Sequence, residues 1–162
     1  MEKTVIVNGL QYTLRTATAA DLPTIMRHRR NMYTDMGFTA EGAINAMATT
    51  SAPLIKEGLE DGSFRGWLVE VAGEVVAGGG IVVLDYPSSP RDPNSRRAFI
   101  VNMFTEPGFR NRGLARLIME EMIHWCREQK FAWVALHASN DGRHLYEKLG
   151  FKSTNEMRLE LR

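Results

Sequence analysis

The chain has 162 residues, of which 44% are hydrophobic and 24% charged, so its composition is that of an ordinary globular domain spanning residues 1–162. A formal net charge of +1 gives no reason to expect nucleic acid or an anionic membrane as a partner. No signal peptide or membrane-spanning apolar run is visible, and the lone Cys126 cannot form an internal disulfide. We therefore expect a cytoplasmic protein.

The first half of the chain predicts two hairpins and two helices. Asn8-Gly9 and Ala72-Gly73 are turn sequences between runs of strand-forming residues. Thr18 and Asp21 match a capping box, so the regular part of the first helix is expected to start near Asp21. The expected strands are 5–7, 12–15, 66–71 and 74–84, and the expected helices are 18–36 and 41–60, the second interrupted or bent near Pro53.

The stretch after residue 98 carries the strongest functional signal. Residues 99–105 are rich in β-branched and aromatic types and predict a strand, which Glu106-Pro107-Gly108 ends. Apolar residues then return with helical spacing over residues 113–129. The loop between strand and helix contains Arg110 and Arg112, and it presents free backbone N–H groups at the positive end of a helix dipole. Together these features predict a site for a ligand that carries phosphates.

Several other kinds of site are excluded by spacing. Gly108 and Gly113 have Walker A spacing, but Leu114-Ala115 stand where that motif needs Lys and Ser or Thr. Gly78-Gly79-Gly80 is not followed by a helix pattern, which argues against a dinucleotide loop. The four histidines lack metal-ligand spacing and no G-x-S-x-G element occurs, so we expect neither a metal site nor a serine hydrolase.

The last third of the chain predicts a strand, a short helix and a final strand. Residues 132–138 form the strand, residues 141–149 the helix, which Gly150-Phe151 ends, and residues near 157–161 the final strand. Residues 85–96, with three prolines, are expected to be an exposed loop. An antiparallel first half followed by a crossover indicates an α+β fold with three α/β/α layers.

Two segments resemble the GNAT superfamily of N-acetyltransferases. The family's pyrophosphate loop, Gln/Arg-x-x-Gly-x-Gly/Ala, follows a strand ending in hydrophobic-x-Pro; here Thr105-Glu106-Pro107 is followed by Arg110, Gly113 and Ala115. One helix and one strand later, Leu145-Tyr146-Glu147-Lys148-Leu149-Gly150-Phe151 resembles the family's closing segment. The order of elements is also that of the GNAT fold, a mixed and mostly antiparallel sheet with two splayed strands.

The resemblance implies that acetyl-coenzyme A binds in the gap between the splayed strands. Strand backbone would pair with the pantetheine arm, and loop backbone would hold the pyrophosphate. Where the family often has Asn, seven positions before the tyrosine, this chain has Ser139 followed by Asn140, and Ser139 alternatively caps the short helix. The expected cofactor contacts are Phe104, Thr105, Arg110, Asn111, Arg112, Gly113, Leu114, Ala115, Ser139 and Asn140.

Tyr146 is the implied catalytic residue. Attack of an amine on a thioester expels a thiolate, and a phenol with a pKa of about 10 can protonate a sulfur whose thiol pKa is about 8.5. The alternative is that its ring only packs beneath the cofactor strand. The general base is left open, with four candidates: Glu70, Glu74, Asp85 and His137.

The first two helices are expected to recognise the acceptor, as they do in the family. Arg29 lies in an apolar stripe with Tyr33. A charged side chain in such a stripe has three alternatives: it extends to solvent, it pairs with another residue of the protein, or it binds a carboxylate on the acceptor. Asn102 cannot act as a base but can orient a substrate or a water. The run Arg27-His28-Arg29-Arg30 lacks the interleaved aromatics of a nucleic-acid patch. The expected substrate contacts are Arg29, Tyr33 and Asn102.

The sequence thus predicts an acetyl-coenzyme A-dependent N-acetyltransferase that acts on a primary amine of a small molecule or peptide by direct attack in a ternary complex. A non-catalytic acyl-coenzyme A-binding sensor of the same fold is the alternative. A third hypothesis is transfer of longer acyl groups, accommodated near Met103 and Trp133. The sequence leaves the acceptor, the acyl length and the oligomeric state, a homodimer included, open.

Overall fold

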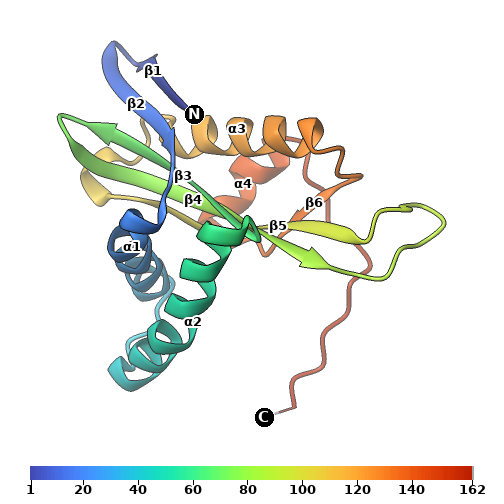
Figure 1. Ribbon diagram of the computed structural model, residues 1–162. Helices are drawn as coiled ribbons and strands as arrows, with labels where there is room; N and C mark the ends of the chain where they lie inside the picture. The colour runs from blue at the N-terminus through green and yellow to red at the C-terminus, as the bar shows by residue number, and fades with distance from the viewer. Residues whose placement is uncertain (162) are drawn as a thin grey trace.

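A six-stranded sheet lies between two layers of helices in the computed structural model, which describes residues 1–161 (Figure 1). The strands are β1 (Glu2–Val7), β2 (Leu10–Thr16), β3 (Phe64–Val71), β4 (Glu74–Asp85), β5 (Arg96–Thr105) and β6 (Val134–Leu136). The helices are α1 (Leu22–Asp35), α2 (Glu41–Asp61), α3 (Leu114–Glu128) and α4 (Asn140–Lys148), with single 3-10 turns η1 (Ala19–Asp21) and η2 (Pro107–Phe109). The strands follow one another in sheet order, and only β5 and β6 are parallel.

Two apolar cores join the three layers. The larger core lies between the sheet and α3 and contains the fully buried Trp67, Ile81 and Met119. The smaller core joins the sheet to α1 and α2 through Ile25, Ile55 and Phe64. The predicted α+β architecture, with a mixed and mostly antiparallel sheet, is confirmed.

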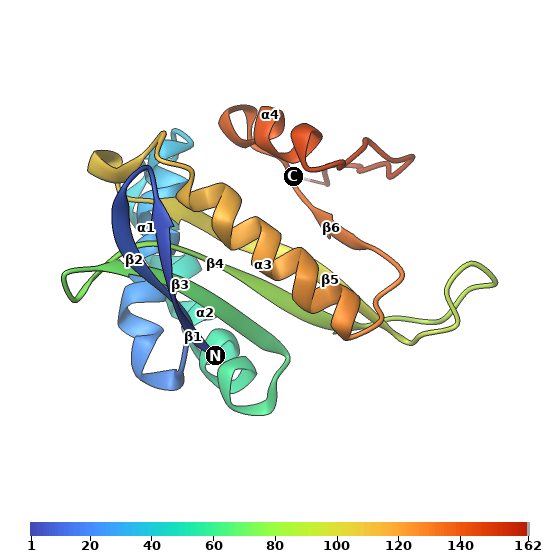
Figure 2. The same ribbon diagram turned by 90° about the horizontal axis from the view of Figure 1, so that it is seen from above.

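A β-bulge in β5 shapes the rest of the sheet. Asn102 has φ +58°, and the register between β4 and β5 shifts between Gly78 and Gly80. A Cβ on Gly79 would lie 2.4 Å from Met103 Sδ, so a larger residue opposite the bulge would force the Met103 side chain to move. Pairing between β5 and β6 ends at Ile100 and Leu136, just before the bulge, and beyond it the two strands part (Figure 2). This is the expected splay.

Two elements differ from their predictions. Helix α2 is continuous from residue 41 to residue 61, so Pro53 does not interrupt it. The predicted final strand near residues 157–161 is wrong, because residues 151–161 form no strand. The side chains of Met157, Leu159 and Leu161 are 94%, 81% and 86% exposed. Alternating apolar residues form a strand only where a neighbouring strand supplies hydrogen bonds and a surface to cover.

An ion-pair cluster fastens the start of α1 to the sheet. Arg15 of β2 binds Asp21 at 2.7 Å and Glu70 of β3 at 2.6 Å. Asp21 also accepts the Thr18 N–H at 2.8 Å, which completes the predicted capping box. The hydrogen bond from Arg15 holds the pKa of the Asp21 carboxyl below its ordinary value.

Asp21→Asn is expected to lower the free energy of unfolding at pH 7 by about 1–2 kcal/mol, because it removes a charge-assisted hydrogen bond. The folded-state pKa of Asp21 lies below its unfolded value, so this stabilisation is complete above the ordinary carboxyl pKa and is lost as the pH falls through the folded value. Urea unfolding of both proteins from pH 7 to pH 3 measures the difference, which should shrink with acidity. A difference that does not change with pH would contradict this account.

Candidate functional site

The loop between β5 and α3 has a backbone shaped to bind an anion. Asn111 and Gly113 both adopt left-handed conformations, with φ +59° and +85°, and Gly113 is the N-cap of α3. Such conformations turn neighbouring N–H groups toward a common side, where the positive end of the α3 dipole adds to them. Leu114, 1% exposed, anchors the loop in the core. The loop that the sequence predicts to bind phosphates therefore has left-handed backbone beside a helix N-terminus, a conformation that is able to bind an anion.

Both loop arginines bind groups of the protein itself. Arg110 donates from Nε to the Thr105 carbonyl at 3.0 Å, and its guanidinium pairs with Asp35 at the end of α1. Arg112 donates to the Gly108 carbonyl at 2.9 Å. Arg110 thus joins the loop to α1, and both arginines place positive charge at the predicted phosphate site.

The end of β5 offers backbone to the gap that the bulge opens. Phe104 is buried beneath α1, and Thr105 is half-buried at the last position of the strand. In residues 1–161 the strand has no β6 partner after Ile100. An unpaired strand edge is a template for an extended ligand that carries amide groups. Strand, loop and α3 follow one another directly along the chain, so one ligand can contact all three.

Helix α4 presents a buried tyrosine. Ser139 is its N-cap, because its Oγ accepts the Gly142 N–H at 3.1 Å, whereas Asn140 is exposed at the first helical position. Tyr146 is 9% exposed, and its ring lies over Gly142 so closely that a Cβ there would come 2.8 Å from the phenol oxygen. Burial raises the pKa of Tyr146, so its hydroxyl stays protonated at neutral pH and is able to donate a proton.

Of the three predicted substrate residues, Arg29 contacts both of the others. Arg29 donates from Nη1 to Asn102 Oδ1 at 2.5 Å, and its guanidinium carbon lies 5.2 Å from the centre of the Tyr33 ring. Its Nε lies 3.3 Å from Ser51 Oγ on α2. None of the ion pairs within residues 1–161 includes Arg29. Half-buried, it has only neutral hydrogen-bond partners, which is the arrangement that suits an incoming anion.

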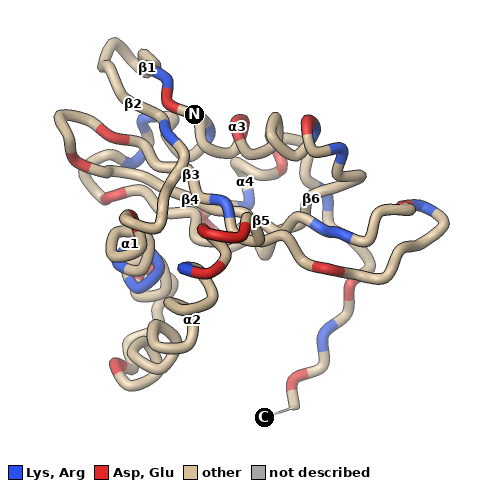
Figure 3. Tube along the Cα trace, viewed as in Figure 1, with Lys and Arg blue, Asp and Glu red and all other residues tan. Residues whose placement is uncertain are grey.

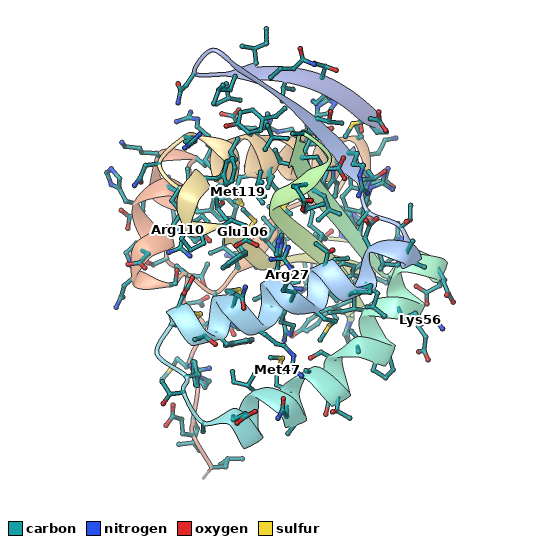
Figure 4. The ribbon with its side chains drawn as sticks, turned by 90° about the vertical axis from the view of Figure 1, so that its left-hand side faces the viewer. Arg27, Met47, Lys56, Glu106, Arg110 and Met119 are labelled. Carbon is teal, nitrogen blue, oxygen red and sulfur yellow. The ribbon has the colours of Figure 1, made fainter. Side chains whose placement is uncertain are left out.

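Sequence reasoning missed His28 and Glu106 at this site. His28 is 2% exposed against the Phe104 ring, and its Nε2 lies 3.6 Å from Glu106 Oε1. Arg27 of α1 pairs with the same carboxylate (Figure 4). Burial lowers the pKa of His28 to about 4, so the imidazole is neutral at pH 7. Helical spacing could have indicated that His28 is buried, because His28 comes three residues after the apolar Ile25 and so lies on the same face of the helix.

The four candidate bases lie in different places. Glu70 is bound to Arg15, whereas Glu74 and Asp85 are exposed at the two ends of β4. His137 packs against the Phe99 ring, with 4.8 Å between ring centres, where β6 has just ended.

Across the described part of the chain, no three His, Cys, Asp or Glu side chains gather to hold a metal ion. None of the described helices is long and apolar enough to cross a membrane.

Comparison with known proteins agrees with this geometry. The sequence model of the Acetyltransferase (GNAT) family matches residues 26–151. The chain belongs to this family. The acetyltransferase is 30% identical over 145 residues to the uncharacterized N-acetyltransferase YjgM of Escherichia coli K12, covering 86% of this chain and 81% of YjgM.

Solved structures of other family members share the fold of this acetyltransferase. A GCN5-related N-acetyltransferase from Ralstonia eutropha JMP134 is 30% identical with a TM-score of 0.87, covering 93% of this chain and 98% of that one. A predicted acetyltransferase from Clostridium acetobutylicum, solved with acetyl-CoA, is 26% identical with a TM-score of 0.84, covering 93% and 96%. The resemblance carried by the two sequence motifs is therefore confirmed.

Coenzyme A is expected to raise the melting temperature of the acetyltransferase, because a ligand that binds only the folded loop stabilises it by about 2.7 kcal/mol at 100 times its Kd. Gly113→Val should abolish the shift, since a β-branched residue does not tolerate a φ of +85°. Gly108→Ala is the matched control, because a Cβ there meets no atom within 4 Å. Thermal unfolding followed by circular dichroism measures all three proteins. An unshifted wild-type protein at millimolar ligand would argue against the site.

Proposed function

We propose that this acetyltransferase transfers an acetyl group from acetyl-CoA to the primary amine of a small molecule or peptide that carries a carboxylate. The observation that carries the proposal is the bulge at Asn102, which parts β5 from β6 and so exposes a strand edge that leads directly into the anion loop. Family membership and the acetyl-CoA complex of the Clostridium acetobutylicum protein support the same donor.

The residues beside the gap between β5 and β6 have the groups needed to bind acetyl-CoA. Acetyl-CoA supplies a thioester-activated acyl group when it is bound. Backbone N–H groups from Asn111 to Ala115 would hold its pyrophosphate, as the left-handed residues and the α3 dipole favour. Backbone near Phe104 and Thr105 would pair with the pantetheine amides. Because the Ser139 hydroxyl is used in capping α4, Asn140 is the better candidate of the two for a side-chain contact.

Transfer by direct attack requires that a proton reach the leaving sulfur. The acceptor nitrogen forms a bond to the acyl carbon and loses one proton to solvent while the carbon–sulfur bond breaks, and the electron pair of that bond stays on sulfur. The group that protonates the sulfur regains its proton from solvent. We assign the proton donor as the Tyr146 hydroxyl, which burial keeps protonated at neutral pH. Its ring lies against Gly142, so the hydroxyl is held close to the first turn of α4.

Arg29 supplies the acceptor preference. Its guanidinium is half-buried, it lacks a carboxylate partner in residues 1–161, and its Nη1 and Nε bonds orient it rigidly between Asn102 and Ser51. A planar guanidinium with free N–H groups binds a carboxylate in bidentate fashion. We therefore expect amino acids or peptides with a nearby carboxylate to be preferred over neutral amines.

Tyr146→Phe keeps the ring and deletes only the hydroxyl. The expected result is a fall in kcat of about 10²–10⁴-fold, with an equal fall in kcat/KM, because a general acid acts in the transition state. Coenzyme A affinity should change little. Release of free thiol from acetyl-CoA measures turnover, and an acyl donor with a better thiol leaving group should rescue the variant.

Tyr12→Phe is the matched control for this experiment. Tyr12 is 1% exposed in the same core, and its buried hydroxyl has no hydrogen-bond partner in the described chain. Its removal should leave turnover unchanged. If Tyr146→Phe turns over normally with both donors, Tyr146 is a packing residue and not the acid.

Arg29→Ala should raise the KM for a carboxylate-bearing acceptor by about 10–100-fold, the equivalent of one charge-assisted hydrogen-bonded contact. The KM for the corresponding amide, which lacks the charge, should change much less, and so should the KM for acetyl-CoA. Arg30→Ala is the matched control, because Arg30 lies next along α1 and binds only Asn45 in the described chain. An equal loss for the acid and the amide would show that Arg29 has a structural role alone.

A further inference from the structure

The turn of the N-terminal hairpin contacts the anion loop, although it lies far from the loop in the sequence. Asn8 is the first residue of the turn between β1 and β2, and its Nδ2 donates to the Arg112 carbonyl at 3.3 Å. Val7 packs on the next residue of the loop, because a Cβ on Gly113 would lie 3.5 Å from Val7 Cγ1. The hairpin therefore covers one side of the loop, close to the start of α3 (Figure 2).

The hairpin and the gap between β5 and β6 lie on opposite sides of this loop. β1 is the first strand in the sheet order and β6 is the last. Helix α3, which the loop begins, packs on the sheet between them, over β3, β4 and β5. A carbonyl of the loop that points toward the hairpin therefore points away from the gap.

The contact with Asn8 fixes the direction of one peptide group of the loop. In a trans peptide the carbonyl of one residue and the N–H of the next point in opposite directions, and residues 1–161 contain no cis peptide. Because Asn8 holds the Arg112 carbonyl toward the hairpin, the Gly113 N–H faces the side of the gap. This N–H binds no acceptor within residues 1–161, so it is free to donate to an anion.

The hairpin turn supplies a hydrogen-bond donor and no charge. Residues 4–14 include no Lys, Arg, Asp or Glu, so the turn is tan in Figure 3. Its backbone needs a left-handed residue at position 8, where φ is +50°. Asn, Asp and Gly are the residues that favour this kind of turn, and of the three only Asn has a side-chain N–H to donate.

The geometry points to Asn8 as a positioning residue for coenzyme A, because its bond to the Arg112 carbonyl turns the Gly113 N–H toward the pyrophosphate. The inference rests on the proposed function, since it takes the loop as the place where that pyrophosphate binds. The role of Asn8 is separate from the attachment of the hairpin to α3, which has an ion pair of its own between Lys3 and Glu121.

The test measures the Kd of coenzyme A by isothermal titration calorimetry. Asn8→Gly keeps the left-handed turn and removes only the amide, so it should raise this Kd about threefold to tenfold, the equivalent of one well-oriented hydrogen bond. The Kd of pantetheine, which lacks the pyrophosphate, should stay unchanged in an NMR titration. A general loosening of the fold would instead weaken both ligands.

Two control variants separate the amide from the hairpin around it. Ala72→Gly makes a comparable change in the β3–β4 turn, where φ is also +50°, and should leave both Kd values unchanged. Lys3→Ala removes the ion pair between the hairpin and α3 while the Asn8 contact remains, so it should leave them unchanged as well.

An unchanged Kd of coenzyme A in Asn8→Gly would overturn this inference alone, because the wild type would still bind the cofactor. Equal losses for coenzyme A and pantetheine, or a loss in Lys3→Ala as large as that in Asn8→Gly, would also overturn it. A wild type that binds no coenzyme A would overturn the proposed function and this inference with it.

Discussion

One extra residue in β5, which forms the bulge at Asn102, marks the place where β5 and β6 separate. The left-handed backbone at Asn102 follows the last residue paired with β6, so the backbone after it keeps its β4 partner but has none on the β6 side. The same bulge presents Asn102 to Arg29 on α1, while Phe104, two positions on, packs against His28. An unpaired strand edge at the surface of a protein promotes aggregation. Here the unpaired edge lies inside the fold, where we propose that a ligand binds.

Helix α1 joins the two halves of the site. Arg27 binds Glu106 just after β5 (Figure 4). Arg29 binds Asn102 within β5, and Asp35 binds Arg110 in the anion loop. These contacts are spread over the length of the helix, so a movement of α1 is felt by the strand edge and by the loop together. The loop and the Arg29–Asn102 contact are therefore both held by the same helix.

Local sequence patterns predicted most of the fold and the loop, and non-local contacts account for the rest. Residues 110–115 and the Tyr146 segment are contiguous motifs, so their spacing was readable directly. The contact between Arg29 and Asn102 joins positions 73 residues apart, and only the possibility of an acceptor or structural partner was visible beforehand. The pattern at residues 157–161 alternates as in a strand, but a strand also needs hydrogen bonds to a neighbour, and in the described residues this segment makes none to another strand. His28 was hidden inside a basic run whose members point in different directions.

The close fit of the Tyr146 ring over Gly142 has a cost for the stability of α4. Glycine inside a helix is about 1 kcal/mol less favourable than alanine, and α4 is a short helix that depends on its Ser139 cap and on the core beneath it. A search for stabilising substitutions would select alanine at this position for its helix propensity, although its Cβ would occupy the space of the phenol. The residue that weakens the helix is thus the one that leaves room for the tyrosine ring, a local conflict between helix propensity and side-chain packing.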